Sequence, residues 1–247
     1  MFLYFDPRYI LFVMLPALAI SAGVQLYLRS TFGRWRQVRN SAGLTGEQVA
    51  DALFERGSVA AVATERSGKR IPLLKRIPIQ RSQAGALSDH FDPRANVVRL
   101  SEPVATQPSV ASMAVVAHEL GHVQQQQRHS PLMAARNVLV PAVTFSPMLS
   151  YGLIFGGLIL RSSGLVWLGV LAFALVVLFA VLTLPVEIDA SRRGLRLLRE
   201  TGLMQTDDDA HGSRAVLTAA ATTYVGAAVT AVLQLLYFVM LAGGRRG

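Results

Sequence analysis

Four long stretches without a charged side chain constrain the fold of this 247-residue chain more than any other feature. They are Tyr9–Leu28, Val138–Leu160, Gly164–Leu184 and Ala215–Ala242. A helix needs about 20 apolar residues to cross a hydrocarbon core of about 30 Å. One such stretch could be a buried core helix. Four of them, in a chain that is 52% hydrophobic and only 16% charged, predict an α-helical membrane protein with four transmembrane helices.

The first apolar stretch could instead be a cleaved signal peptide, since Ala17–Ala19 has the small-residue pattern of a cleavage site. However, the apolar run is too long for that role, and Arg8 is the only basic residue before it. Basic residues follow the run instead, at Arg29, Arg34, Arg36 and Arg39. We therefore expect residues 9–28 to form a retained span after a short N-terminal end, residues 1–8.

Basic side chains are distributed unevenly among the segments that connect these spans. The chain has 24 Lys and Arg against 15 Asp and Glu, a net charge of +9. Residues 29–137 hold 15 of the basic side chains and residues 185–214 hold five. With four spans these two segments lie on the same side of the membrane, and Lys and Arg gather on the cytoplasmic side. Both segments are therefore expected in the cytoplasm, with Arg245 and Arg246 as a local exception.

Residues 29–137 are expected to fold as a small domain with both helices and strands. Thr45 is a candidate N-cap, and Gln48 completes a capping-box spacing, so a helix should begin there. Gly57 fits the left-handed position beyond the end of that helix. The following run, Ser58–Glu65, is expected to be a strand.

A basic segment and a pair of strands follow. Arg66–Gln83 contains two prolines and one glycine, which indicates a loop or insertion that is either solvated or in contact with lipid headgroups. Ala86–Glu102 predicts a strand, a turn and a second strand, with an Asp-Pro pair and Asn96 supplying the turn. The second strand, Val97–Leu100, is either an ordinary paired strand or an edge to which an extended peptide could add.

A helix predicted over Thr106–His129, with Pro108 in its first turn, carries the sequence H-E-x-x-H. His118 and His122 are one helical turn apart on the same face, so both imidazoles can reach one metal ion. Glu119 lies beside the first histidine, where its carboxylate can take a proton from a water molecule. The chain has no Cys, and Zn²⁺ suits such a nitrogen and oxygen site best. The alternative is two surface histidines on a polar helix end.

A catalytic zinc site usually has a third protein ligand, which must lie on the same side of the membrane. Residues 185–214 predict a cytoplasmic helix that Glu187 opens, just after Pro185. Asp189 is a rival ligand, but it points about 160° away from Glu187 on a helix. Alternatively, Glu187 is an acid that stabilises the helix N-terminus. Ser191, four residues after Glu187, would be a weak hydrogen-bond partner for the first histidine.

Peptide hydrolysis also needs a donor that stabilises the oxyanion. Tyr224, inside the stretch 215–242, either faces the site or is an interfacial aromatic anchor. Of the other candidates, His129 is expected at a polar helix end and His211 in a solvated loop after three aspartates. The complete set of candidates is Tyr224, His90, His129, His211 and Arg193.

Six stretches spread along the chain carry one family resemblance: YFDPRYI, RNSAGLTGEQVA, LSDHFDPRANVVRLSE, VVAHELGHVQQ, LPVEIDASRRGLRLL and TAAATTYVGAA. With them, nearly the whole chain resembles the YugP-type neutral zinc metallopeptidases, a bacterial membrane family related in plan to the HtpX peptidases. The resemblance implies that His118, His122 and Glu187 are the zinc ligands and that Glu119 is the base. The chain departs from the family at the long basic stretch Gly68–Ser82. HtpX-type enzymes have Asp where this chain has Ser191.

The combined prediction is a four-span protein with a small cytoplasmic α+β zincin-like (gluzincin-type) domain. Its expected function is zinc-dependent endopeptidase activity on membrane or membrane-proximal proteins, at the cytoplasmic face of a bacterial inner membrane. The expected partners are protein or peptide substrates and the lipid bilayer. Nucleic acid is not expected, since the basic residues follow the topology, and charge-free spans disfavour an ion transporter. The alternative is a proteolytically silent membrane scaffold or binding protein that keeps the zinc site.

Overall fold

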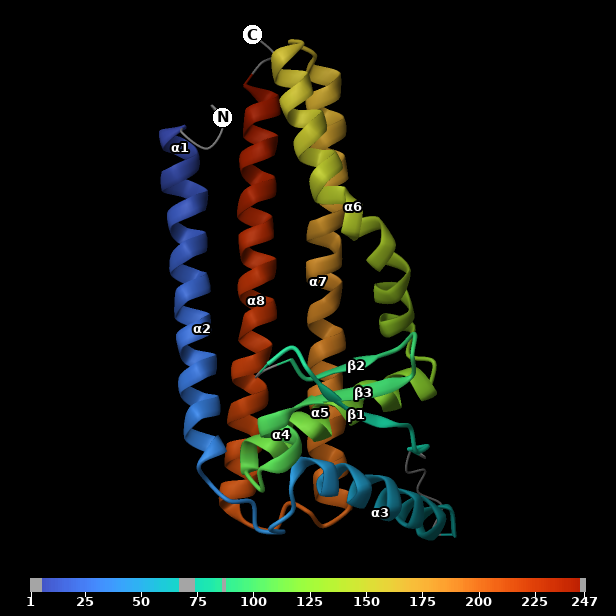
Figure 1. The fold of residues 1–247 in the computed structure, drawn as a ribbon. Helices are drawn as coiled ribbons and strands as arrows, with labels where there is room; N and C mark the ends of the chain where they lie inside the picture. The colour runs from blue at the N-terminus through green and yellow to red at the C-terminus, as the bar shows by residue number, and fades with distance from the viewer. Residues whose placement is uncertain (1–5, 67–73, 86–87, 245–247) are drawn as a thin grey trace. The chain divides into compact units, whose positions relative to one another are not determined.

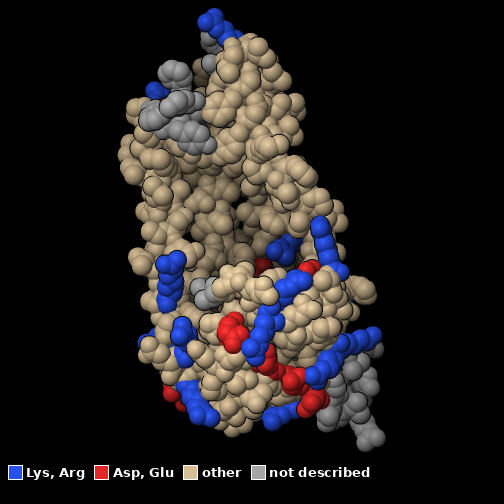
Figure 2. All heavy atoms as spheres, viewed as in Figure 1, with Lys and Arg blue, Asp and Glu red and all other residues tan. Residues whose placement is uncertain are grey.

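A computed structural model describes residues 6–66, 74–85 and 88–244, with residues 58–66 described by their backbone alone (Figure 1). The chain divides into two compact units. The first, here called the bundle unit, consists of Met1–Leu26, Ala134–Pro185 and Thr222–Gly247. The second, here called the site unit, consists of Tyr27–Met133 and Val186–Ala221. In Figure 2 the charged side chains gather over the site unit, and the visible face of the bundle unit is almost free of them.

Four helices of the described chain are long and apolar enough to cross a membrane, as predicted. The first runs over Pro7–Arg36 and is built from α1 (Pro7–Tyr9), a π-helical turn η2 (Ile10–Met14) and α2 (Leu15–Arg36). The others are α6 (Pro131–Ile159), α7 (Ser163–Glu200) and α8 (Asp207–Gly243). Each contains most or all of one predicted span, and the span boundaries themselves stay a prediction.

Close helix contacts and apolar side chains build the bundle unit. A Cβ atom added at Gly169 of α7 would lie 2.9 Å from the carbonyl oxygen of Ser150 in α6, so only glycine allows this approach. Ser150 also donates from Oγ to the Gly169 carbonyl oxygen at 2.8 Å. Large apolar side chains on the outside are widely exposed, including Val138 at 77% and Ile159 at 79%. Such a surface is suited to lipid rather than to water.

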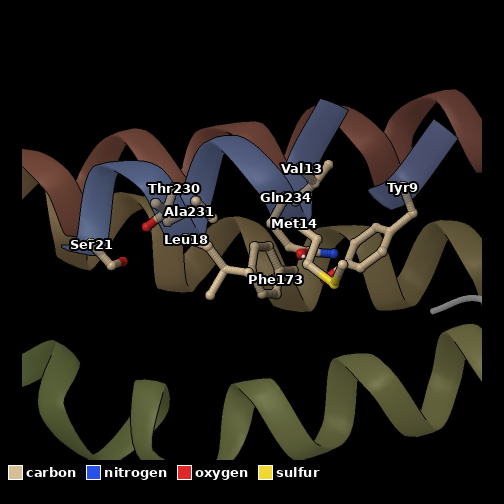
Figure 3. Close-up of a pocket in the computed structure, with 10 residues that line it drawn as sticks. Tyr9, Val13, Met14, Leu18, Ser21, Phe173, Thr230, Ala231 and Gln234 are labelled. Carbon is tan, nitrogen blue, oxygen red and sulfur yellow. Dashed lines mark hydrogen bonds between the residues drawn. The ribbon is translucent and has the colours of Figure 1, made fainter. Parts of the chain in front are cut away.

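A pocket of about 360 Å³ lies within the bundle unit, among α1, η2, α2, α7 and α8 (Figure 3). Its walls are mainly apolar, with Val13, Leu18 and Phe173 among them. At one end Tyr9 donates its hydroxyl hydrogen to Oε1 of Gln234 at 2.9 Å. This bond satisfies polar groups that would be costly to leave unpaired inside a hydrocarbon layer.

The site unit contains a three-stranded mixed sheet in the order β1-β3-β2. β2 (His90–Asp92) and β3 (Val97–Ser101) are antiparallel, with Asn96 in the left-handed conformation at φ 51°, so the predicted strand, turn and strand are confirmed. β1 (Ile79–Ser82) pairs with β3 in parallel. Because β3 is paired on both sides, the alternative that it is an edge strand is wrong.

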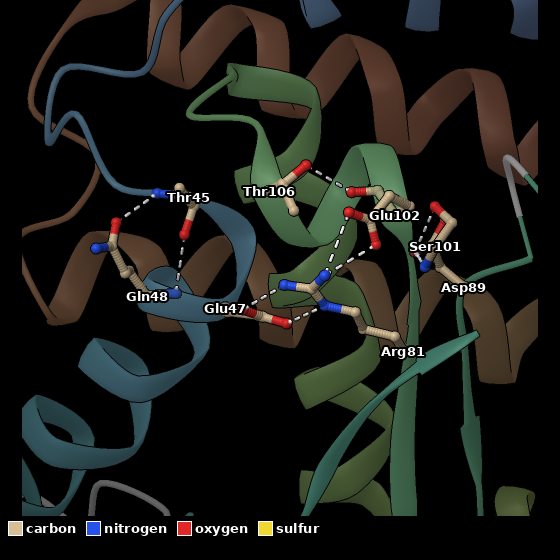
Figure 4. A network of polar contacts seen from close by, with 8 residues as sticks. All are labelled: Thr45, Glu47, Gln48, Arg81, Asp89, Ser101, Glu102 and Thr106. Atoms are coloured by element: carbon tan, nitrogen blue, oxygen red, sulfur yellow. Dashed lines mark hydrogen bonds and ion pairs between the residues drawn. The ribbon is translucent and has the colours of Figure 1, made fainter. Parts of the chain in front are cut away.

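The helix at Thr45 begins as predicted but ends later. The Thr45 N–H donates to Oε1 of Gln48 at 2.9 Å, and the Gln48 N–H donates back to the Thr45 hydroxyl oxygen (Figure 4). α3 then runs over Gly46–Arg66, so the predicted strand at Ser58–Glu65 is wrong and Gly57 is inside the helix. Alanine has the highest helix propensity, and this stretch is rich in it.

The basic segment is also more structured than predicted. β1 lies inside Arg66–Gln83, and residues 67–73 of that segment, which include the first part of the Gly68–Ser82 departure, lie outside the described residues. Arg81 of β1 pairs with Glu47 of α3 at 3.0 Å and with Glu102 at 3.1 Å (Figure 4). These ion pairs connect the strand to two helices.

The helix with H-E-x-x-H is shorter than predicted. A separate short helix, α4 (Glu102–Thr106), comes first, and α5 covers Val110–Gln127. Ser109 is the N-cap and its Oγ accepts from the Ser112 N–H at 3.0 Å, so Pro108 precedes the helix instead of lying in its first turn. α5 is almost completely buried in the core of the site unit.

Candidate metal centre

The two histidines of α5 lie side by side, as their spacing predicts. The ring centroids of His118 and His122 are 4.7 Å apart. His122 is buried and only 12% of the His118 side chain is exposed. The alternative of two surface histidines on a polar helix end is therefore wrong.

Two glycines bring the backbone of α7 against this part of α5. A Cβ atom at Gly121 would lie 2.2 Å from the Ala190 carbonyl oxygen, and one at Gly194 would lie 2.6 Å from the Ala117 carbonyl oxygen. No side chain fits at such distances, so each helix needs glycine where it meets the other. The element that approaches Gly121 is therefore α7.

Glu187 of α7 reaches both histidines across this contact. Its Oε2 atom lies 3.2 Å from Nε2 of His118 and 3.3 Å from Nε2 of His122. The three ligand atoms lie within 4.8 Å of one another, and Glu187 is only 2% exposed. Two imidazole nitrogens and one carboxylate oxygen are donors that zinc prefers, and three protein ligands leave one coordination position open. This donor set fits a catalytic zinc ion.

The position of Glu187 differs from the prediction in one respect. It does not open a helix, because α7 runs without a break from Ser163 to Glu200 and contains Pro185 in its interior. The alternative that Glu187 stabilises a helix N-terminus is therefore wrong. Its proximity to two imidazoles is the reason that a carboxylate can be buried here.

Asp189, the rival ligand, points elsewhere. Its Oδ2 accepts from Nε of Arg193 at 2.7 Å and from Nε2 of Gln125 at 2.8 Å. The structure therefore brings Glu187 to the histidines and directs Asp189 to a guanidinium and an amide.

The negative charge of Glu187 changes the pKa of the histidine beside it. Burial alone would lower the pKa of His122, but the hydrogen bond and negative charge of Glu187 outweigh it, so the pKa is raised. The contacting atoms of these two residues are the same atoms that would bind a metal. Glu119, the predicted base, is 6% exposed and directly follows His118 in α5.

Each histidine has a partner for its second ring nitrogen. Nδ1 of His118 lies 3.1 Å from Oγ of Ser191, the contact that helical spacing predicted. Nδ1 of His122 lies 2.9 Å from Oε1 of Gln125. Sequence reasoning missed Gln125, although its position three residues after His122 places it on the same side of the helix.

Gln125 belongs to a run of four glutamines, which together contact three other segments of the site unit. Gln124 accepts from Arg193 at 3.1 Å, and Gln126 donates to the Pro93 carbonyl oxygen at 3.2 Å. Gln127 exchanges two hydrogen bonds with the backbone of Lys75, at 2.7 and 2.8 Å. The end of α5 is therefore attached to α7, the β2–β3 turn and the segment before β1.

The oxyanion candidates are scattered. His90 is exposed on β2, and His129 lies beyond the end of α5. His211 lies in α8, not in a loop, with its ring centroid 5.7 Å from that of Trp35. Arg193 is engaged by Asp189 and Gln124. Tyr224 belongs to the bundle unit, and its role in the site stays a prediction.

Comparison with known proteins assigns the family. Residues 10–243 match the model of a family described as "Putative neutral zinc metallopeptidase", and the chain belongs to this family. Zinc is therefore the expected metal of the His-His-Glu cluster. One relative is "Putative membrane protease YugP" of Bacillus subtilis (strain 168), 34% identical over 231 residues that cover 94% of this chain and 95% of the relative. No solved structure matches the chain.

Proposed function

We propose that this protein is a membrane-embedded zinc endopeptidase that hydrolyses membrane or membrane-proximal proteins at the cytoplasmic face of the bacterial inner membrane. The observation that carries the proposal is the meeting of Glu187 with both histidine Nε2 atoms at 3.2 and 3.3 Å. His118, His122 and Glu187 would hold the ion. The site unit that presents them would be a zincin-like domain, as its helix and sheet content suggests.

The residues of the site would divide the chemistry between them. When bound, zinc supplies Lewis-acid chemistry: it lowers the pKa of a water molecule towards neutrality and polarises the scissile carbonyl group. The Glu119 carboxylate would take the proton of the attacking water and pass it to the leaving amine. Tyr224 is the proposed donor to the oxyanion.

The membrane assignment of the substrates rests on two observations. The chain that carries the site also has four helices suited to a membrane, and its relative in Bacillus subtilis is named a membrane protease. The proposed cytoplasmic side is supported by the 20 basic residues in 29–137 and 185–214.

Glu119→Gln tests the proposal against a silent scaffold. Glutamine keeps the size of the side chain but cannot accept the proton, so zinc should stay bound while peptide hydrolysis falls by about 10²–10⁴-fold. Zinc content of the detergent-purified chain and proteomic comparison of cells with wild-type or variant protein would measure both. A variant that fully complements a deletion strain, with no substrate accumulating, would establish the scaffold instead.

A further inference from the structure

Gln125 is a completely buried polar side chain next to the metal-site cluster, with 0% of its surface exposed. It makes three hydrogen bonds: with His122 Nδ1 at 2.9 Å, with the Val186 carbonyl oxygen at 2.8 Å and with Asp189 Oδ2 at 2.8 Å. A buried amide with three partners in fixed positions has one orientation that satisfies all of them.

The partners decide which way the amide points. The Val186 carbonyl and the Asp189 carboxylate can only accept, so the amide NH₂ of Gln125 must face both of them. Its carbonyl oxygen is then left for His122. Because that oxygen can only accept, Nδ1 of His122 must carry the hydrogen. In the neutral ring Nε2 then keeps its lone pair, and Nε2 is the atom that faces Glu187.

The same amide also holds the third candidate ligand in place. Val186 directly precedes Glu187 in α7, so its bond to Gln125 fixes the backbone at that ligand. Asp189, two residues beyond Glu187, is anchored in turn by Arg193 at 2.7 Å. One side chain of α5 thus connects His122 to the turn of α7 that carries Glu187. The second nitrogen of His118 contacts the hydroxyl of Ser191, a weaker partner than the amide, within the described part of the chain.

We propose that Gln125 is a positioning residue that sets the zinc affinity of the site. It holds His122 in the Nδ1–H tautomer and fixes the Glu187 backbone through its bond to the Val186 carbonyl oxygen. Asp189, itself held by Arg193, keeps the amide in this orientation. A neutral amide takes the place that a carboxylate often has beside a zinc-binding histidine. Gln125 itself is not one of the three candidate ligands. This inference rests on the zinc site of the proposed function.

Gln125→Met is the test, because methionine nearly fills the same volume without any of the three bonds. The matched control is Gln126→Met, the same substitution one residue later, where a single bond to the Pro93 carbonyl is lost. Zinc dissociation constants of the full chain in detergent would be measured by competition with a chelator, below the unfolding temperature of each metal-free variant. Gln125→Met should weaken zinc binding by about 10–100-fold. Gln126→Met should change it by less than about threefold.

A merely structural role would give a different pattern. In that case Gln125→Met would lower the unfolding temperature of the metal-free protein, yet the folded fraction would bind zinc as tightly as wild type. That outcome overturns the inference, and so does an equal loss of affinity in both variants. The visible spectrum of the cobalt-substituted protein gives a second measure, since a displaced His122 changes the ligand field. It should change in Gln125→Met and not in Gln126→Met.

These measurements separate the inference from the proposed function. If wild type binds zinc tightly and Gln125→Met binds it weakly, the inference stands even when wild type cleaves no peptide. If wild type is an active peptidase and Gln125→Met keeps full zinc affinity, the function stands and the inference fails.

Discussion

Glu187 and Asp189 show how two neighbouring acids acquire different roles. Both belong to α7, two residues apart, and a helix directs them to different faces. Glu187 meets two imidazoles, and Asp189 meets a guanidinium and an amide. The position of each on the helix, and not its acidity, decides which one can be a ligand.

This difference predicts the metal content of two variants. Glu187→Ala leaves two histidines, which hold zinc poorly, so the purified protein should contain far less than one zinc per chain. Asp189→Ala leaves all three ligand atoms and disturbs one anchor of Gln125, so it should keep zinc with an affinity reduced only several-fold. Elemental analysis of both proteins measures the effect. Full zinc in Glu187→Ala with loss in Asp189→Ala would show that the ligand assignment is wrong.

At the scale of elements, the contact of α5 with α7 creates the site. H-E-x-x-H on one helix offers two ligands, and the third arrives only because the backbones of α5 and α7 touch. The contact depends on glycines at two places, one in each helix. Fold and metal site therefore depend on the same two positions.

Gly121→Ala should lower both the stability of the fold and the zinc affinity of the site. Its new methyl group would overlap the Ala190 carbonyl oxygen, a backbone atom that cannot move aside without shifting α7. We expect a loss of about 1–3 kcal/mol of stability from such overpacking, together with weaker zinc binding. Thermal unfolding and zinc titration of the same protein measure the two effects.

Gly33→Ala is the matched control for this change. Gly33 lies in the part of α2 that belongs to the site unit, and a Cβ atom there has no atom within 4 Å. Alanine should stabilise the helix there by up to about 1 kcal/mol and leave zinc binding unchanged. Equal effects of the two substitutions would mean that the contact at Gly121 is not as tight as described.

The carboxyl group of Asp92 in the β2–β3 turn should make the stability of the fold depend on pH. Arg99 donates to Asp92 at 2.7 Å, and with the turn N–H groups of Ala95 and Arg94 it lowers the pKa of Asp92 to about 2. A carboxyl group with a lowered pKa stabilises the fold above its ordinary pKa near 4, and this contribution disappears as pH falls towards 2. The gap in unfolding temperature between wild type and Asp92→Asn should therefore be widest above pH 5 and close as pH falls. A gap that does not depend on pH would contradict the assignment.

Features that depend on neighbouring residues could be predicted from the sequence. Contacts between distant segments could not. The Thr45–Gln48 capping box and the turn at Asn96 depend on residues a few positions apart, so both could be predicted. The parallel pairing of β1 with β3 could not, since no short-range pattern fixes it. Residues 58–65 mix valine with alanine, and the favoured structure of such a run depends on its surroundings. Gln125 has partners 61 and 64 residues away, and helical spacing alone cannot find them.

At the scale of the whole molecule, the distribution of charge predicts how the chain is oriented in the membrane. The site unit holds most of the basic residues, and the bundle unit exposes apolar side chains. From the positive-inside rule we expect the candidate metal centre on the cytoplasmic side, as proposed above.

Single cysteines can test this topology without background, because the chain has none of its own. Gln83 and Asp208 are exposed in the site unit, and Ser163 is exposed at the start of α7. In intact cells an impermeant thiol reagent should label Ser163→Cys but not Gln83→Cys or Asp208→Cys. In permeabilised cells it should label all three. Labelling of Gln83→Cys from outside would reverse the proposed orientation.

The four glutamines at the end of α5 should keep the site ordered in the metal-free protein. A helix end that is attached to three other segments does not fray, so the amide hydrogens of its last turn should exchange slowly with solvent, whether zinc is present or absent. The histidines are then ordered when the chain folds, and binding of an ion costs little further conformational entropy. A protein that loses its zinc should keep the geometry of the empty site and take up a new ion without refolding.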